Sequence, residues 1–287
     1  MSIEAVARLL AVLDVQRDGD LSFSATPSSD SPHRLFGGLV VAQALVASGR
    51  TVSPDRPPHA LHAHFLGAGD PTLPLTFSID RLRDGRAFST RQTTVSQGGR
   101  PILHLVSSFH DHEDGLELQD SMPSAPEPDA LPDWHNRLLA RVAPQTIAHV
   151  EWDALDMRCD DRAVSPAQPN LQVWLRTSAI MPSSALLNAA VLTYATDLTM
   201  LAAVPLPNPA DDNPQRFAVA SLDHSTWFHR PLRVDSWLLH DQHSPGSAGG
   251  RSLVIGRVFR SDGVLVASTA QEGLLRPQPS QGAKRDR

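Results

Sequence analysis

The sequence predicts an α+β fold in which two similar units each wrap an antiparallel sheet around one long helix. A long apolar helical segment followed by several strand signals occurs once in each half of the chain. The second helical segment is apolar on all sides, which favours burial on most sides. A proline-rich stretch separates the two patterns. We therefore expect an N-terminal unit at 1–115, a linker at 116–145 and a C-terminal unit carrying the functional site at 146–287.

The N-terminal unit is expected to begin with a short amphipathic helix and then to place its apolar helix at Leu35–Gly49, with small residues along one side. Strand signals follow in the segments 59–71, 75–97 and 98–111. Turns are expected at Asp84-Gly85 and at Gly98-Gly99, because such pairs favour the backbone of tight hairpin turns.

The linker holds four prolines between Met122 and Pro132, and a short helix is expected near Trp134–Arg141. The C-terminal unit then repeats the order of the first unit around a helix at Ser184–Val204. Its strands are expected at 146–158, 171–178, 218–231, 235–243, 251–260 and 263–273, with turns at 244–250 and Asp262-Gly263. When Gly99 is aligned with Gly263, Ser107 falls opposite Gln271. The two sheets would join into one larger sheet, since this covers their open edges.

Composition excludes several classes of partner. The net charge is −6 and the basic residues are scattered, so a nucleic-acid-binding face is not expected. The single cysteine, Cys159, cannot form an internal disulfide, and the first 16 residues lack the pattern of a signal peptide, which together favour the cytoplasm. The apolar stretch Ala185–Leu206 resembles a membrane span, but Asp197 near its middle would be costly in lipid. We expect a buried helix there and no membrane span.

Asp197 is the strongest candidate for chemistry. It is the only charged residue between Arg176 and Asp211, and its helical neighbours three and four residues away include no cation. One interpretation is a structural aspartate held by a distant arginine or by backbone amides. The other is a base held in a dry cleft, where burial raises its pKa unless donors stabilise the charged form.

Two further residues could supply such donors. The segment 263–273 alternates so that Gln271 shares an inward face with Thr269 and Ala267. Ser221 shares a face with Val219 on the preceding strand segment, although a lone serine is a weak signal. His224 and His229 are expected to be structural, because the thirteen histidines show no metal-ligand spacing. No esterase elbow or phosphate loop is present, and no metal or cofactor is expected.

Taken together, the motifs resemble the acyl-CoA thioesterase II family over nearly the whole chain. The motifs that carry the resemblance are "RLFGGLVVAQAL", "FLGAGDP", "LRDGRAFSTR", "MPSAPEPDALP", "YATDLTML", "LDHSTWFHRP" and "DGVLVASTAQEG". The resemblance implies a double hot-dog fold, intracellular hydrolysis of fatty acyl-CoA and a homo-oligomer, either a dimer or a tetramer. It also implies an active site made of Asp197, Ser221 and Gln271.

The chain departs from the family pattern at three places. Ser221 stands where bacterial relatives often have threonine, which keeps the hydroxyl. Leu39 replaces the usual glutamine, and Gly67-Ala68 replaces a usual Arg-Pro pair. The last two changes lie in the first unit, so they bear on substrate contacts or the interface more than on the active-site residues.

The mechanism implied by the resemblance is direct attack of water on the thioester, with Asp197 as general base. Two rival functions are an enoyl-CoA hydratase-like enzyme and a non-catalytic acyl-CoA-binding protein. The first needs an Asp and a His about five residues apart, and Asp235 and His240 have this spacing. That stretch has the pattern of a strand, in which residues five apart face opposite ways.

Overall fold

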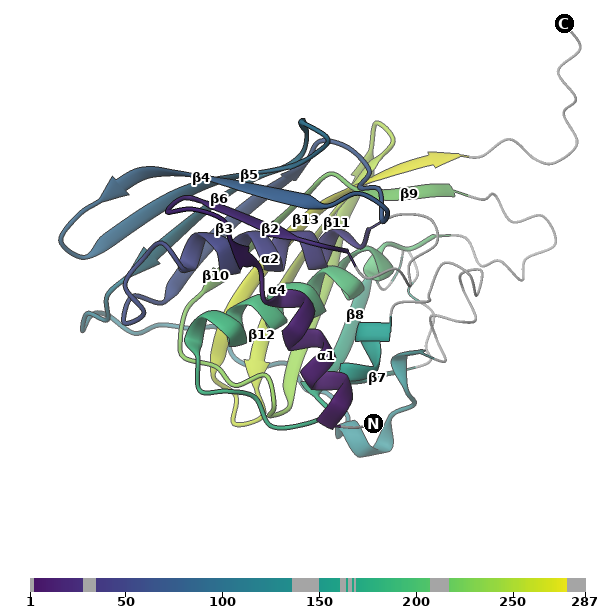
Figure 1. The fold of residues 1–287 in the computed structure, drawn as a ribbon. Helices are drawn as coiled ribbons and strands as arrows, with labels where there is room; N and C mark the ends of the chain where they lie inside the picture. Colours follow the sequence, from purple (N-terminus) through teal and green to yellow (C-terminus); the bar gives the residue numbers. More distant parts are fainter. Residues whose placement is uncertain are drawn as a thin grey trace, which may run out of the picture.

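A computed structural model describes residues 3–27, 35–135, 150–160, 164, 167, 169–206 and 217–277 of the chain. The described residues form one large antiparallel sheet wrapped around two long helices, α2 and α4, which lie side by side (Figure 1). A third helix, α1, lies at the N-terminus and packs against the segment that follows the linker. The expected α+β fold with one joined sheet is confirmed.

The first unit contains two helices, two short strands at one edge of the sheet and four longer strands. Its elements are α1 (Ile3–Leu13), β1 (Gln16–Arg17), β2 (Ser22–Ala25), α2 (Gly37–Gly49), β3 (Pro58–Phe65), β4 (Leu75–Asp84), β5 (Phe88–Gln97) and β6 (Arg100–His110). The β5–β6 turn places Gly98 and Gly99 at φ values of +54° and +79°, which residues other than glycine rarely adopt.

The second unit follows short 3₁₀ turns and repeats this order. Its elements are η1 (Pro128–Ala130), η3 (Val150–Ala154), β7 (Leu155–Cys159), β8 (Asn170–Thr177), α4 (Ala185–Met200), η4 (Leu201–Ala203), β9 (Phe217–Ser221), β10 (Asp223–Phe228), β11 (Leu238–Ala248), β12 (Arg251–Arg260) and β13 (Leu265–Pro277).

The strand order explains how two units make one sheet. The order is β1-β2-β4-β5-β6-β3-β10-β13-β12-β11-β8-β7, and β9 pairs with β13 in addition. In the first unit β3, which follows the helix, pairs with the last strand, β6. In the second unit β9 and β10, which follow the helix, pair with the last strand, β13, so the two halves have the same topology. The units meet where β3 and β10 pair antiparallel, with Ala60 opposite Trp227 and His64 opposite Asp223. This pairing covers the edges that each unit alone would expose.

Helix α4 is apolar all round because it is enclosed. The stretch Ala185–Ala203 has the length and hydropathy of a membrane span, yet 67 % of that window is buried inside the protein. Ser184 caps the N-terminus, and its side-chain oxygen accepts a hydrogen bond from the backbone N–H of Leu187. A buried polar residue on this helix therefore faces protein on every side.

Three expected elements differ in the structure. The segment 218–231 forms two strands, because the Asp223 carboxylate accepts the N–H of Glu272 over 2.7 Å, at the point where β9 ends and β10 begins. In the described part of the segment 146–158, the 3₁₀ helix η3 occupies Val150–Ala154, and strand begins only at Leu155 with β7. Strand β11 continues through a bulge between His243 and Gly246, so the expected turn at 244–250 narrows to Gly249 and Gly250.

The two long helices and the hairpins between 75 and 110 are confirmed. The short helix expected near Trp134–Arg141 lies mostly outside the described residues. The unit boundaries at 115 and 145 stay predictions.

Candidate active site

Asp197 lies on α4 between the start of α2 and the inner face of the sheet, and its side chain is only 3 % exposed. Its carboxylate accepts a hydrogen bond from the backbone N–H of Gly38 and another from Nε2 of Gln271, 3.0 Å away. Nδ1 of His224 lies 3.7 Å from the same Oδ1 atom. The charged form of Asp197 is therefore stabilised by one backbone donor, one amide and one imidazole.

Gln271 connects the members of the site. It lies on the inner face of β13 and is fully buried. Its Nε2 donates to Oδ1 of Asp197 and also to Oγ of Ser221, 2.7 Å away. Its Oε1 lies 2.9 Å from Nδ1 of His224. The three residues predicted from the sequence are thus brought together, and His224 joins them.

The break between β9 and β10 positions Ser221 and His224 on opposite sides of Gln271. Ser221 ends β9 and pairs with Gly273, whereas His224 lies on β10 beside β13. Ser221 is partly exposed, while His224 is completely buried. The serine therefore faces the accessible side of the site and the imidazole lies behind it.

Two glycines allow α2 to approach Asp197. A Cβ atom on Gly38 would lie 2.6 Å from the Phe36 ring and 2.8 Å from Cβ of Asp197. A Cβ atom on Gly37 would lie 2.8 Å from the ring of Phe65. Only glycine fits this contact without displacing the helix. The N-terminus of α2, with its unpaired N–H groups and positive dipole end, thus lies against the carboxylate.

Burial raises the pKa of Asp197 above its ordinary value. The electrostatic effect of His224 and the hydrogen bonds from Gly38 and Gln271 act in the opposite direction and lower it. A carboxylate with a raised pKa is a stronger base than an exposed one, provided that it is ionised at the working pH.

A buried polar layer continues behind the site. Nε2 of His224 lies 3.3 Å from the hydroxyls of both Thr196 and Thr226. Further along, His240 lies between the hydroxyls of Thr199 and Thr269, each 3.0 Å away. Burial lowers the pKa of His240 to about 3, so this imidazole is neutral at physiological pH.

The Asp235–His240 pair does not form a catalytic dyad. Asp235 is paired with Arg233 and accepts the backbone N–H of Met181, 2.8 Å away. His240 points to the opposite side, toward α4. His229 is directed toward β13 instead of Asp197, and its Nε2 lies 2.8 Å from Oγ of Ser268.

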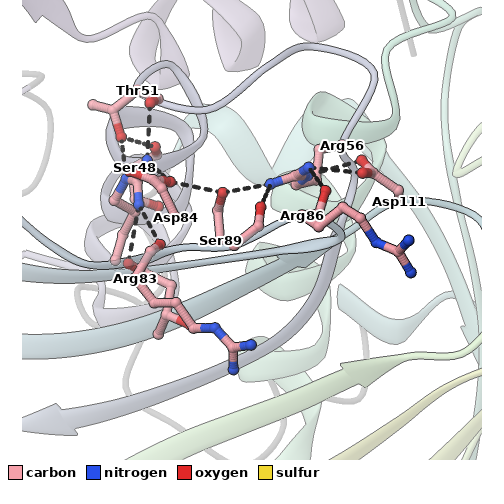
Figure 2. Close-up of polar contacts among 11 residues, drawn as sticks. Ser48, Thr51, Arg56, Arg83, Asp84, Arg86, Ser89 and Asp111 are labelled. Atoms are coloured by element: carbon pink, nitrogen blue, oxygen red, sulfur yellow. Dashed lines mark hydrogen bonds and ion pairs between the residues drawn. The ribbon is translucent and has the colours of Figure 1, made fainter.

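The equivalent position in the first unit carries no acid. Ser107, which aligns with Gln271, donates a hydrogen bond to Ser48 of α2 over 2.9 Å, and both side chains are fully buried. Beside them the buried Arg91 donates to Asp84 and to Thr51. Figure 2 shows this network, which starts at Ser48, Thr51 and Asp84 and continues to Arg56 and Asp111. The first unit thus has the hydroxyls of Ser48 and Ser107 where the second unit has the carboxylate of Asp197 and the amide of Gln271. We interpret the Ser48–Ser107 pair as structural.

The sequence does not predict the contact between His224, which is expected to be structural, and Gln271. This contact depends on the pairing of β10 with β13, which no local spacing reveals. The alternation of residues along β10 places His224 and Thr226 on the inner face of the sheet, and this pattern can be recognised in the sequence. Among the described residues, no group of three or more histidine, cysteine or acidic side chains is arranged to hold a metal ion.

Comparison with protein-family models matches both halves of the chain. Residues 26–110 match the model described as "Acyl-CoA thioesterase N-terminal domain", and residues 164–274 match the model described as "Acyl-CoA thioesterase". Among curated proteins, the human acyl-coenzyme A thioesterase 8 is 35 % identical over 86 % of this chain and 82 % of its own length. The acyl-CoA thioesterase 2 of Haemophilus influenzae is 32 % identical over 93 % of this chain and 96 % of its own.

Solved structures agree with the fold. An acyl-CoA thioesterase II from Mycobacterium marinum superposes with a TM-score of 0.79 at 34 % identity, covering 94 % of this chain and 98 % of that one. A protein with a hot-dog fold from Alicyclobacillus acidocaldarius superposes with a TM-score of 0.75 at 19 % identity, covering 95 % and 99 %. The second likeness shows the fold alone. The two helix-wrapped halves with one joined sheet are a double hot-dog.

The raised pKa of Asp197 predicts a characteristic pH dependence of stability. The folded state binds this proton more tightly than the unfolded chain does. The resulting stabilisation is complete below the unfolded pKa, about 3.9, and is lost as the pH rises through the folded pKa. The Asp197→Asn variant lacks the carboxyl group, so its stability does not include this pH-dependent contribution. Thermal melting should therefore show that the Tm of the variant rises relative to wild type as the pH is raised above about 4, the unfolded pKa of aspartate, through the folded pKa of Asp197.

Asp235→Asn is the matched control. The hydrogen bonds from Arg233 lower the pKa of Asp235, so wild type gains stability from this group as the pH rises through its folded pKa. The Tm difference of this variant should change only below about pH 5 and with the opposite sign. If the Tm difference of Asp197→Asn is constant across the range, the buried carboxyl does not titrate as described.

Proposed function

Because the chain belongs to the acyl-CoA thioesterase II family, we propose that it hydrolyses fatty acyl-CoA thioesters to free fatty acid and CoA, with Asp197 as the general base. The observation that carries this proposal is the convergence of Asp197, Gln271 and Ser221 at the start of α2. No cofactor is needed for the reaction, since a thioester carbonyl is electrophilic enough for direct attack by water.

The proposed reaction has one attacking water and no covalent enzyme intermediate. Asp197 accepts a proton as the water oxygen bonds to the carbonyl carbon, and the carbonyl oxygen becomes an oxyanion. When the tetrahedral intermediate collapses, the C–S bond breaks and CoA leaves as a thiolate, which takes up the proton that Asp197 accepted, so the carboxylate is regenerated. The Ser221 hydroxyl accepts a hydrogen bond from Gln271, which leaves its own hydrogen and a lone pair to hold the water.

The start of α2 is the best-placed source of oxyanion donors. The first N–H groups of a helix have no acceptor within the helix. The N–H of Gly38 is already bonded to Asp197, and its neighbours in the same turn lie beside it. Donors fixed in place before the reaction stabilise developing negative charge without reorganisation, and losing one typically costs about 10²–10³ in rate.

The geometry disfavours both rival functions. A hydratase needs an imidazole that touches the substrate, but His224 is 0 % exposed and Asp235 does not pair with His240. A protein that only binds acyl-CoA has no use for a desolvated carboxylate held by three polar groups. Released thiol distinguishes the three functions, because hydrolysis frees CoA whereas hydration and binding do not.

Asp197→Asn tests the general base. The amide cannot accept a proton from water, so kcat/KM for acyl-CoA hydrolysis should fall by about 10²–10⁴-fold, the usual worth of a general base. The assay follows thiol release with a chromogenic reagent across a panel of acyl-CoA chain lengths. Asp235→Asn, the same chemical change at a distant ion pair, should keep wild-type turnover. Wild-type turnover in Asp197→Asn would exclude the role of general base.

We also propose that the chain forms a homo-oligomer in the cytoplasm. The outer face of the central strands exposes Val106, Trp227, Leu253 and Ile255, between 37 % and 44 % each, and large exposed apolar side chains that lie near one another often mark an interface. A second copy offers the same apolar surface, so self-association would cover it. The cytoplasmic assignment is supported by the single cysteine, Cys159, which is buried and has no second cysteine in the chain with which to form a disulfide.

One fractionation experiment tests both assignments. Light scattering after size exclusion of the chain from the soluble cell fraction should give at least twice the 31.1 kDa of one chain. Trp227→Asp should lower that mass, because it puts a charge into the apolar face. A single-chain mass for wild type at micromolar concentration excludes the oligomer, and recovery outside the cytoplasmic fraction excludes the location.

A further inference from the structure

The orientation of the Gln271 carboxamide decides whether the site works. An amide group can be turned by 180°, which exchanges its donor and its acceptor. With Nε2 toward Asp197 and Ser221, both hydrogens of the amide are used. In the reverse orientation the amide oxygen would face the carboxylate oxygen and repel it. The site therefore requires a group that makes the first orientation the stable one.

His224 is the group on the other side of the amide. Its Nδ1 lies 2.9 Å from Oε1 of Gln271. A carbonyl oxygen can only accept, so Nδ1 must carry a hydrogen and donate it. If the amide turned over, Nε2 would meet this N–H and two donors would face each other. The imidazole thus favours the productive orientation by the hydrogen bond it makes and by the one it prevents.

His224 is itself held rigidly. Its side chain is 0 % exposed, and Nε2 contacts the hydroxyls of Thr196 and Thr226, each at 3.3 Å. Strand β10 is paired on both sides, with β3 and with β13, at the junction of the two units. The imidazole has neither the room nor the backbone freedom to follow a misplaced amide.

We propose that His224 is a positioning residue for the hydrolysis, whose Nδ1–H fixes the Gln271 carboxamide so that Nε2 points at Asp197 and Ser221. This inference rests on the proposed function. His224 does not touch the substrate and acts through Gln271. A second effect follows from the 3.7 Å separation between Nδ1 and Oδ1 of Asp197, since the imidazole also stabilises the carboxylate.

The pH dependence of kcat is set by the groups that surround Asp197. From α2 the contact is the backbone N–H of Gly38, and from β13 it is the neutral amide of Gln271. From β10 it is His224, and His240 on β11 lies behind it as the next titratable side chain. On α4 itself, Tyr194 packs its ring against Phe36, with ring centroids 5.1 Å apart. Removing His224 therefore removes an imidazole that acts on the carboxylate directly.

His224→Leu and His224→Asn form the test pair. Leucine fills the space without a donor, so kcat should fall by about 10²-fold, as for other small misplacements of catalytic groups, with KM little changed. The acidic limb of the kcat profile should move to higher pH, because Asp197 loses a stabilising neighbour. Asparagine can place an N–H close to the position of Nδ1 and should restore at least a tenth of the wild-type kcat.

His240→Leu is the control for a structural role. His240 is equally buried under α4, but its ring nitrogens lie beside the hydroxyls of Thr199 and Thr269 instead of the amide of Gln271. This variant should lose thermal stability without moving the pH profile. A merely structural His224 would behave in the same way, and that result would overturn the proposal.

A double-mutant cycle with Gln271→Ala shows whether the effect passes through the amide. If it does, His224→Leu should cost less than about threefold in kcat once Gln271 is absent. Costs that multiply independently would refute the positioning role, while leaving the proposed hydrolysis intact. If wild type releases no thiol at all, the proposed function fails separately. The side-chain amide resonances of Gln271 then still test the orientation, since they should shift in His224→Leu and stay in place in His240→Leu.

Discussion

The proposed active site depends on keeping one carboxylate charged in a place from which water is almost excluded. Desolvation of Asp197 works against ionisation, so every neighbour that approaches it has to supply a donor or a compensating dipole. Gly38 supplies a backbone N–H, Gln271 an amide and His224 an imidazole. The two glycines at the start of α2, the break between β9 and β10, and the polar layer behind α4 all serve this requirement.

This constraint also explains why the chain needs both units. The acid and the amide come from the second unit, but the helix start that faces them comes from the first. The reverse arrangement exists as well, with Ser48 and Ser107 at the corresponding place. Both of these side chains are uncharged, and Arg91, which pairs with Asp84, donates to Thr51 just after the end of α2. In the proposed site the second unit therefore supplies the carboxylate and the amide, and the first unit supplies the helix terminus that faces them.

Sequence reasoning found the parts of the site that leave a local trace. Asp197 is conspicuous as a lone charge in an apolar helix. The alternation of one strand makes Gln271 only a weak candidate, which the family resemblance then singles out together with Ser221. The sequence does not single out His224, because its contact with Gln271 depends on the pairing of β10 with β13. The break before Asp223 was missed for a similar reason, since it depends on a hydrogen bond to Glu272, 49 residues away. The fold was predictable because helix and hairpin signals repeat, whereas contacts between distant strands are set by the whole sheet.

The most direct test of this account is the charge of Asp197 in the folded protein. Carbon NMR of the aspartate carboxyl groups, assigned by comparison with Asp197→Asn, follows that charge as the pH changes. We predict a titration midpoint above that of exposed aspartates, with the group ionised at pH 7. A carboxyl that is still protonated at pH 7, or one that titrates like an exposed aspartate, would contradict the central claim.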